Sequence, residues 1–163
     1  MILKDRIDSF IKLGASFFNF KNLSSFNSVI IDAEKNNIWF DKNNIEHAIL
    51  SLSKMLDSDL LKNFTSHYKI HDNQKKVGVI IPSNIPLVGF YDFLCVLLSG
   101  HIFIGKLSSY NNILLPFVAN LLCNIDARFK SKIYFQENLS SVDFVIATGG
   151  DNSSINFTYL FKN

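Results

Sequence analysis

The sequence predicts an α/β fold in which helices pack on a parallel sheet. Three short apolar segments, 77–81, 101–107 and 143–147, have the length and composition of buried strands. The apolar segment 88–99 lies between the first two and predicts a helix that Gly100 ends. Strands that alternate with helices along a chain are typical of parallel sheets.

Composition and length indicate one globular unit. The chain has 163 residues, of which 48% are apolar and 16 are phenylalanine, so it can bury a core. The net charge of +2 and the scattered basic residues give no basic stripe, so we expect no nucleic-acid partner. The longest apolar run, 87–98, is too short to span a bilayer, so we expect no membrane span.

The two cysteines, Cys95 and Cys123, lie far apart in the sequence and in no metal-like spacing. We therefore expect no metal site, and we expect a reducing, cytoplasmic setting.

The first 76 residues predict a mainly helical lead-in. Apolar residues at helical spacing predict a short amphipathic helix in 3–13, and Val29–Ile31 predicts a short strand or a buried tether. Asp41 is a good N-cap for the next helix, and Trp39-Phe40 would pack back onto its first turns.

Helical spacing continues through two apolar series, one from Ile45 to Leu56 and one from Leu60 to Tyr68. The polar run 71–76 then predicts a linker. We therefore divide the chain into the lead-in, 1–76, and a sheet-bearing part, 77–163.

The sheet-bearing part contains two further elements and an unfinished end. Pro116 is tolerated only in a first turn, so a helix is expected to start near Ile113. Residues 133–135 predict a small strand, and Asp151 could cap a last helix. The sequence stops barely two turns later with an apolar face that nothing obvious covers, so we expect it to be cut rather than finished.

Candidate ligand-binding residues follow the predicted strands. Parallel sheets bind ligands at the carboxyl ends of their strands, where Asn84, Lys106 and Thr148-Gly149-Gly150 fall. The two glycines would let the backbone approach a pyrophosphate at a helix N-terminus. Plainer roles fit the same residues: Asn84 could shape a turn between prolines, Lys106 could be a solvated charge, and the glycines could form an ordinary strand-to-helix turn.

Three motifs give the chain a family resemblance. Pro-Ser-Asn-Ile-Pro-Leu at 82–87, Gly-Lys-Leu-Ser-Ser at 105–109 and Ala-Thr-Gly-Gly at 147–150 are similar, in order and spacing, to motifs of aldehyde dehydrogenases. The fuller run 85–100 resembles one branch, the LuxC-type fatty acyl-CoA reductases. The resemblance spans roughly residues 36–163. It implies a Rossmann-like sheet of aldehyde dehydrogenase type, incomplete here, and NADPH-dependent reduction of a fatty acyl-CoA to an aldehyde.

The resemblance also implies roles for particular residues. Asn84 would donate its side-chain N–H to the oxyanion or thiohemiacetal on a catalytic cysteine. Lys106, with Ser108 and Ser109, would bind the adenosine ribose, and Thr148-Gly149-Gly150 would contact the pyrophosphate. Many NAD enzymes carry Glu at the position of Ser109, where a carboxylate would repel a 2′-phosphate. Its absence here permits NADPH or NADP, and NAD stays an alternative.

The nucleophile expected of this family is missing. Cys95 lies within one apolar helix and Cys123 on the apolar side of the next, so we expect both thiols to be buried, with a raised pKa, and inert. In the family the catalytic Cys lies in a second domain, beyond the Thr-Gly-Gly turn. We therefore expect the N-terminal part of an acyl-CoA reductase, inactive alone, whose partners are a fatty acyl-CoA and a C-terminal catalytic half or a second copy. The alternative is a nucleotide-binding remnant, or a subunit that pairs with a separately encoded catalytic half.

Overall fold

The structure, a computed structural model, describes residues 1–22, 24–69 and 73–148. Within these residues it contains one four-stranded sheet, and every strand pair is parallel. The strands are β1 (Lys76–Ile81), β2 (Ile102–Leu107), β3 (Ile133–Phe135) and β4 (Phe144–Ala147). Their spatial order, β3-β2-β1-β4, reverses direction between β1 and β4, as in a Rossmann-like sheet. The predicted α/β class and the three strands first identified in the sequence are confirmed.

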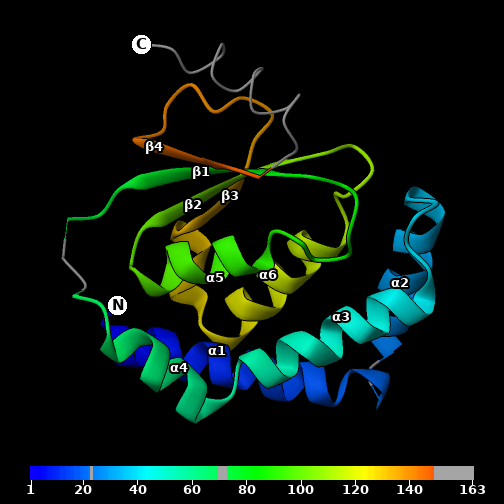
Figure 1. Ribbon diagram of the computed structural model, residues 1–163, viewed down its shortest axis with the longest axis horizontal. Helices are drawn as coiled ribbons and strands as arrows, with labels where there is room; N and C mark the ends of the chain where they lie inside the picture. The colour runs from blue at the N-terminus through cyan, green and yellow to red at the C-terminus, as the bar shows by residue number, and fades with distance from the viewer. Residues whose placement is uncertain (23, 70–72, 149–163) are drawn as a thin grey trace.

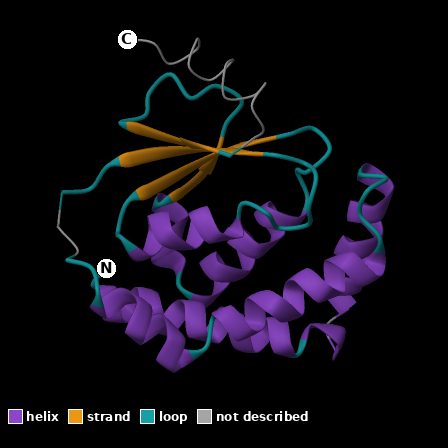
Figure 2. Cartoon of the chain, in the orientation of Figure 1, coloured by secondary structure: helices purple, strands orange, loops and turns teal. Residues whose placement is uncertain are grey.

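The helices form two layers on one side of the sheet. Figures 1 and 2 show α5 and α6 next to the strands, with α1, α3 and α4 beyond them. The helices are α1 (Leu3–Phe18), α2 (Ser24–Asn36), α3 (Lys42–Met55), α4 (Ser58–Ser66), α5 (Phe90–Leu98) and α6 (Leu114–Ile125), and the short 3₁₀ turns are η1 (Phe20–Asn22) and η2 (Ala127–Ser131). The mainly helical N-terminal segment is confirmed.

Val29–Ile31 is not a strand. These residues lie inside α2, so the strand alternative of that prediction is wrong. Phe26, Ile30 and Ala33 of α2 are buried and stand four and three residues apart, which is helical spacing. Burial of this face against the core outweighs the strand preference of a short β-branched run.

Asp41 caps α3 as predicted, because its carboxylate accepts a hydrogen bond of 2.8 Å from the Asn44 backbone N–H. Only one of the two preceding aromatic residues is buried. Phe40 is buried, whereas Trp39 has 73% of its surface exposed. A hydrophobic staple uses the residue directly before the N-cap, which is the position of the buried Phe40 and not of Trp39.

Only some of the apolar residues between Leu60 and Tyr68 are buried. Asp57 starts α4 by accepting hydrogen bonds from the backbone N–H groups of Asp59 and Leu60. Leu61 is buried, but Leu60 and Tyr68 are exposed. The predicted apolar face of this helix is therefore narrower than the sequence indicated.

Gly100 ends α5 in a Schellman motif. Its backbone has a φ of +87°, and its N–H donates to the carbonyl of Leu97 while the N–H of His101 donates to that of Val96. The next helix, α6, starts at Leu114 with Pro116 in its first turn, as predicted. The helix expected after Asp151 lies outside the described residues.

A chain of phenylalanine rings joins the sheet to the N-terminal helices. Phe103 of β2 contacts Phe93 of α5 with ring centroids 5.0 Å apart, and Phe93 contacts Phe10 of α1 at 6.3 Å. All three rings are fully buried in one continuous hydrophobic cluster. The division of the chain into 1–76 and 77–163 stays a prediction about how it folds.

Across the described parts of the chain, no helix is long and apolar enough to cross a membrane. The same residues hold no group of three or more His, Cys, Asp or Glu side chains arranged for a metal ion.

Candidate functional site

The residues singled out in the sequence gather at the carboxyl edge of the sheet. Lys106 of β2 and Ala147 of β4 both pair with Ile80 of β1, one on each side. Neighbouring strands lie about 4.8 Å apart, so these two flanking positions are roughly 10 Å apart. Asn84, Lys106 and Thr148 are all exposed. Each lies at or beyond the carboxyl end of its strand, which is the end at which such sheets bind ligands.

Two buried asparagines hold the loop that carries Asn84. The side-chain N–H of Asn111 donates to the carbonyl of Pro82 at 2.7 Å, and that of Asn37 donates to the carbonyl of Ser83 at 2.8 Å. Both asparagines are only 3% exposed. The two carbonyls directly before Asn84 are therefore fixed from the protein side, while the Asn84 side chain faces outward.

The asparagines themselves are fixed by their own loops. The Oδ1 of Asn37 accepts a hydrogen bond from the Trp39 backbone N–H at 3.0 Å. The backbone N–H of Asn111 donates to the carbonyl of Ser108 at 3.0 Å. Asn36 joins the two loops, because its side-chain N–H donates to the carbonyl of Ser109 at 3.2 Å. The turn between α2 and α3 is thus hydrogen-bonded to the loops that follow β1 and β2.

Sequence reasoning gave Asn37 and Asn111 no role. An asparagine in a polar loop is usually exposed, and only the folded chain reveals that these two are buried and donate to the carbonyls of Pro82 and Ser83.

The loop after β2 contains the other candidate cofactor residues. Ser108 is half-buried, and its Oγ accepts a long hydrogen bond of 3.4 Å from the Tyr110 backbone N–H, whereas Ser109 is exposed. No Asp or Glu occurs between residues 93 and 125. Neither β2 nor the loop after it therefore supplies a carboxylate that would repel a phosphate. Gly149 and Gly150, the remaining candidates, lie outside the described residues.

The two thiols are half-buried helical side chains. Cys95 lies in α5 and Cys123 in α6, and both are free. Burial raises the pKa of each thiol, as expected, although neither is fully enclosed as the sequence had suggested. A thiol with a raised pKa carries little thiolate near neutral pH, which makes it a weak nucleophile.

The fold defines an α/β protein with a Rossmann-like parallel sheet. The sequence model of one family, described as Acyl-CoA reductase (LuxC), matches residues 17–155. The chain therefore belongs to the LuxC acyl-CoA reductase family, whose reductases are nucleotide-dependent. A comparison with curated proteins gave no match.

Proposed function

We propose that this chain forms the cofactor-side part of a reductase that converts a fatty acyl-CoA to an aldehyde with NADPH. The observation that carries the proposal is that Asn84, Lys106 and Thr148 are exposed at or beyond the carboxyl ends of adjacent parallel strands, where the strand order reverses between β1 and β4. Membership of the acyl-CoA reductase family supports the substrate class.

The carboxyl edge suits a dinucleotide with a 2′-phosphate. Lys106 is exposed and supplies a positive charge, and Ser108 and Ser109 supply hydroxyls beside it. The lack of carboxylates across β2 and its following loop favours NADP(H) over NAD. Thr148, Gly149 and Gly150 would contact the pyrophosphate. The cofactor, when bound, supplies the hydride.

Asn84 would act on the acyl group. A thiolate that attacks the thioester carbon leaves negative charge on the carbonyl oxygen, and departure of the CoA thiolate then restores the carbonyl. A side-chain N–H fixed where that charge develops stabilises the transition state by about 3 kcal/mol in comparable sites. The fixed carbonyls of Pro82 and Ser83 support such preorganisation.

The attacking thiol would not be Cys95 or Cys123. Each is a half-buried helical residue whose pKa is raised by burial. The nucleophile would come from a catalytic half beyond these residues or from a separately encoded chain that pairs with this one, so the 163 residues would be inactive alone. The two free thiols support a cytoplasmic location.

Isothermal titration calorimetry with NADPH and NADH tests the cofactor part of the proposal. We expect NADPH to bind more tightly than NADH, and Lys106→Ala to weaken NADPH binding by about tenfold or more, the value of one hydrogen bond to a charged group. Lys76→Ala is the matched control, because Lys76 is an exposed lysine at the opposite end of β1. No binding at millimolar NADPH, or equal losses in the two variants, would refute the assignment.

A further inference from the structure

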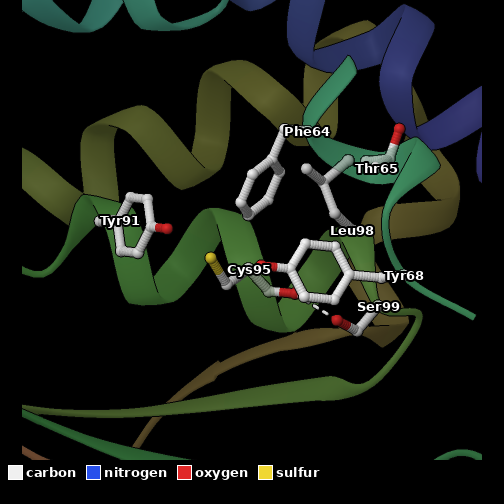
Figure 3. A pocket seen from close by; sticks show the side chains of 7 residues that line it. All are labelled: Phe64, Thr65, Tyr68, Tyr91, Cys95, Leu98 and Ser99. Atoms are coloured by element: carbon white, nitrogen blue, oxygen red, sulfur yellow. Dashed lines mark hydrogen bonds between the residues drawn. The ribbon is translucent and has the colours of Figure 1, made fainter. Parts of the chain in front are cut away.

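A pocket of about 210 Å³ opens between α4 and α5, away from the loops described above. Its walls are two turns of α5 and the facing side of α4, as Figure 3 shows. The lining residues are Phe64, Thr65, Tyr68, Tyr91, Cys95, Leu98 and Ser99. An engineered cavity of about 150 Å³ lined by apolar side chains binds benzene, so this space is large enough for an apolar group.

Three aromatic rings form the mouth and side of the pocket. Phe64 is central, with its ring centroid 5.3 Å from that of Tyr68 and 6.4 Å from that of Tyr91. Tyr68 and Tyr91 are more than half exposed. In Figure 3 the Cys95 sulfur lies between these two tyrosine rings. The rings therefore join α4 to α5 and leave the space between the helices open to solvent.

The lining is mainly apolar in surface, although four of its residues, Thr65, Tyr68, Tyr91 and Ser99, carry a hydroxyl. The Thr65 hydroxyl donates to the carbonyl of Leu61 at 2.8 Å, and the Ser99 hydroxyl donates to the carbonyl of Cys95 at 2.8 Å. Both hydroxyls are thus used within their own helices, and none of the seven lining residues is charged. An apolar ligand would therefore leave the hydrogen bonds of Thr65 and Ser99 intact, whereas a charged one would lose its hydration without an opposite charge among the lining residues.

We propose that this pocket holds the aliphatic tail of the acyl group, a proposal that rests on the acyl-CoA reductase function given above. Helix α5 begins at Phe90, just after the loop of Asn84, and runs back toward the amino edge of the sheet. The pocket follows α5 from Tyr91 to Ser99, a helical rise of about 12 Å. A thioester carbonyl at Asn84 would then have its tail extended along α5. In this arrangement the tail occupies the pocket and the polar CoA portion stays outside it.

Cys95 gives a direct readout of occupancy, with Cys123 as an internal control. The full chain is treated with N-ethylmaleimide at about pH 9, where more of each thiol is ionised, and labelling of the two cysteines is followed by peptide mass spectrometry. We expect dodecanoyl-CoA, kept below its micelle concentration and at about ten times its dissociation constant, to slow labelling of Cys95 roughly tenfold. Labelling of Cys123 should not change, and free CoA and acetyl-CoA should protect neither thiol.

The pocket assignment would be overturned if dodecanoyl-CoA slowed labelling of both cysteines equally, or if free CoA slowed labelling of Cys95 as much as dodecanoyl-CoA does. It would also be overturned if saturating dodecanoyl-CoA left the labelling of Cys95 unchanged. If NADPH still bound in those cases, only the tail site would be wrong. If Cys95 were protected by dodecanoyl-CoA while NADPH failed to bind, the tail site would stand and the reductase assignment would fall.

A pair of variants separates occupancy from a general effect on the protein. Cys95→Phe places a ring in the pocket, whereas Leu60→Phe adds bulk on the exposed side of α4, outside the pocket lining. By calorimetry we expect the first variant to bind dodecanoyl-CoA at least tenfold more weakly and the second to bind it normally. A folded Cys95→Phe protein, with an unchanged far-UV CD spectrum and thermal transition, that binds as tightly as the parent would contradict the proposal.

Discussion

The side-chain N–H of Asn111 donates to the carbonyl of Pro82 at 2.7 Å, and this contact joins the loop after β2 to the loop after β1. Asn111 is buried, so solvent does not compete for the bond. The contact fixes the backbone just before Asn84 at the edge where the two strands end. The position of Asn84 therefore depends on Asn111, a residue that is not itself one of the candidate binding residues.

Removal of this side chain should destabilise the protein. Asn111→Ala removes the hydrogen-bond partner of the Pro82 carbonyl at a partly buried position, and we expect a loss of about 1–3 kcal/mol in the free energy of unfolding. Urea denaturation measures it. Asn120→Ala on the exposed face of α6 serves as the control and should change stability little. Similar losses in the two variants would show that the Asn111 contact contributes nothing specific.

Gly100 should resist replacement by residues with a side chain. Its φ of +87° is unfavourable for L-residues, and a Cβ added there would lie 2.6 Å from Nη1 of Arg6. We expect Gly100→Ala to lower stability by about 1–2 kcal/mol, and Gly100→Asn to lower it less, because Asn tolerates the left-handed region better. Thermal denaturation distinguishes the two. A neutral Gly100→Ala would contradict the left-handed geometry.

Stability should fall in mild acid because of His101. Its Nδ1 accepts a hydrogen bond of 3.2 Å from the backbone N–H of Lys75, and burial, helped by the positive charge of Arg6, lowers the pKa of His101. In the unfolded chain this pKa is about 6.5, so the unfolded state binds a proton first as pH falls. Stability should be constant with respect to His101 above that pH and decrease from about 6.5 down to the folded pKa.

The pH effect can be assigned with two variants. His101→Asn keeps a hydrogen-bond acceptor and should remove this component of the pH dependence, whereas His47→Gln on the exposed side of α3 should preserve it. Denaturant melts between about pH 5 and 8 provide the measurement. An unchanged pH profile in His101→Asn would show that other groups cause the effect.

Phe10 should couple the N-terminal helices to the sheet. Its buried ring contacts both Phe93 of α5 and Phe129 of η2. We expect Phe10→Ala to cost about 3–5 kcal/mol, while Phe18→Ala on the same helix, at 72% exposure, should cost little. A single cooperative transition that shifts as a whole would show that residues 1–76 and the sheet unfold together. Two transitions, with only one shifted, would support the predicted division of the chain.

The sheet and the residues at the carboxyl ends of its strands could be predicted because their signals are local. Apolar runs marked the strands, Gly100 marked the end of α5, and Pro116 marked the start of α6. Once the strands are parallel, the residues that follow them must share one edge. The amino-acid order alone therefore suffices to assign Asn84 and Lys106 to that edge.

The remaining features depend on contacts between distant segments. The strand preference of Val29–Ile31 yielded to burial of one face of α2, which involves the tertiary core. The burial of Asn37 depends on a loop 46 residues further along the chain. The pocket between α4 and α5 is lined by residues that lie far apart in the sequence, such as Phe64 and Tyr91. No short sequence pattern encodes such relationships.

The central claim is that a nicotinamide dinucleotide with a 2′-phosphate binds at the carboxyl edge of this sheet. A titration of the ¹⁵N-labelled chain with NADPH, followed by amide chemical shifts, tests it residue by residue. We expect the largest shifts at Asn84, Lys106, Ser108 and Thr148, and none at Lys76 or His101 on the opposite edge. Shifts confined to the opposite edge, or none at saturating NADPH, would contradict the account.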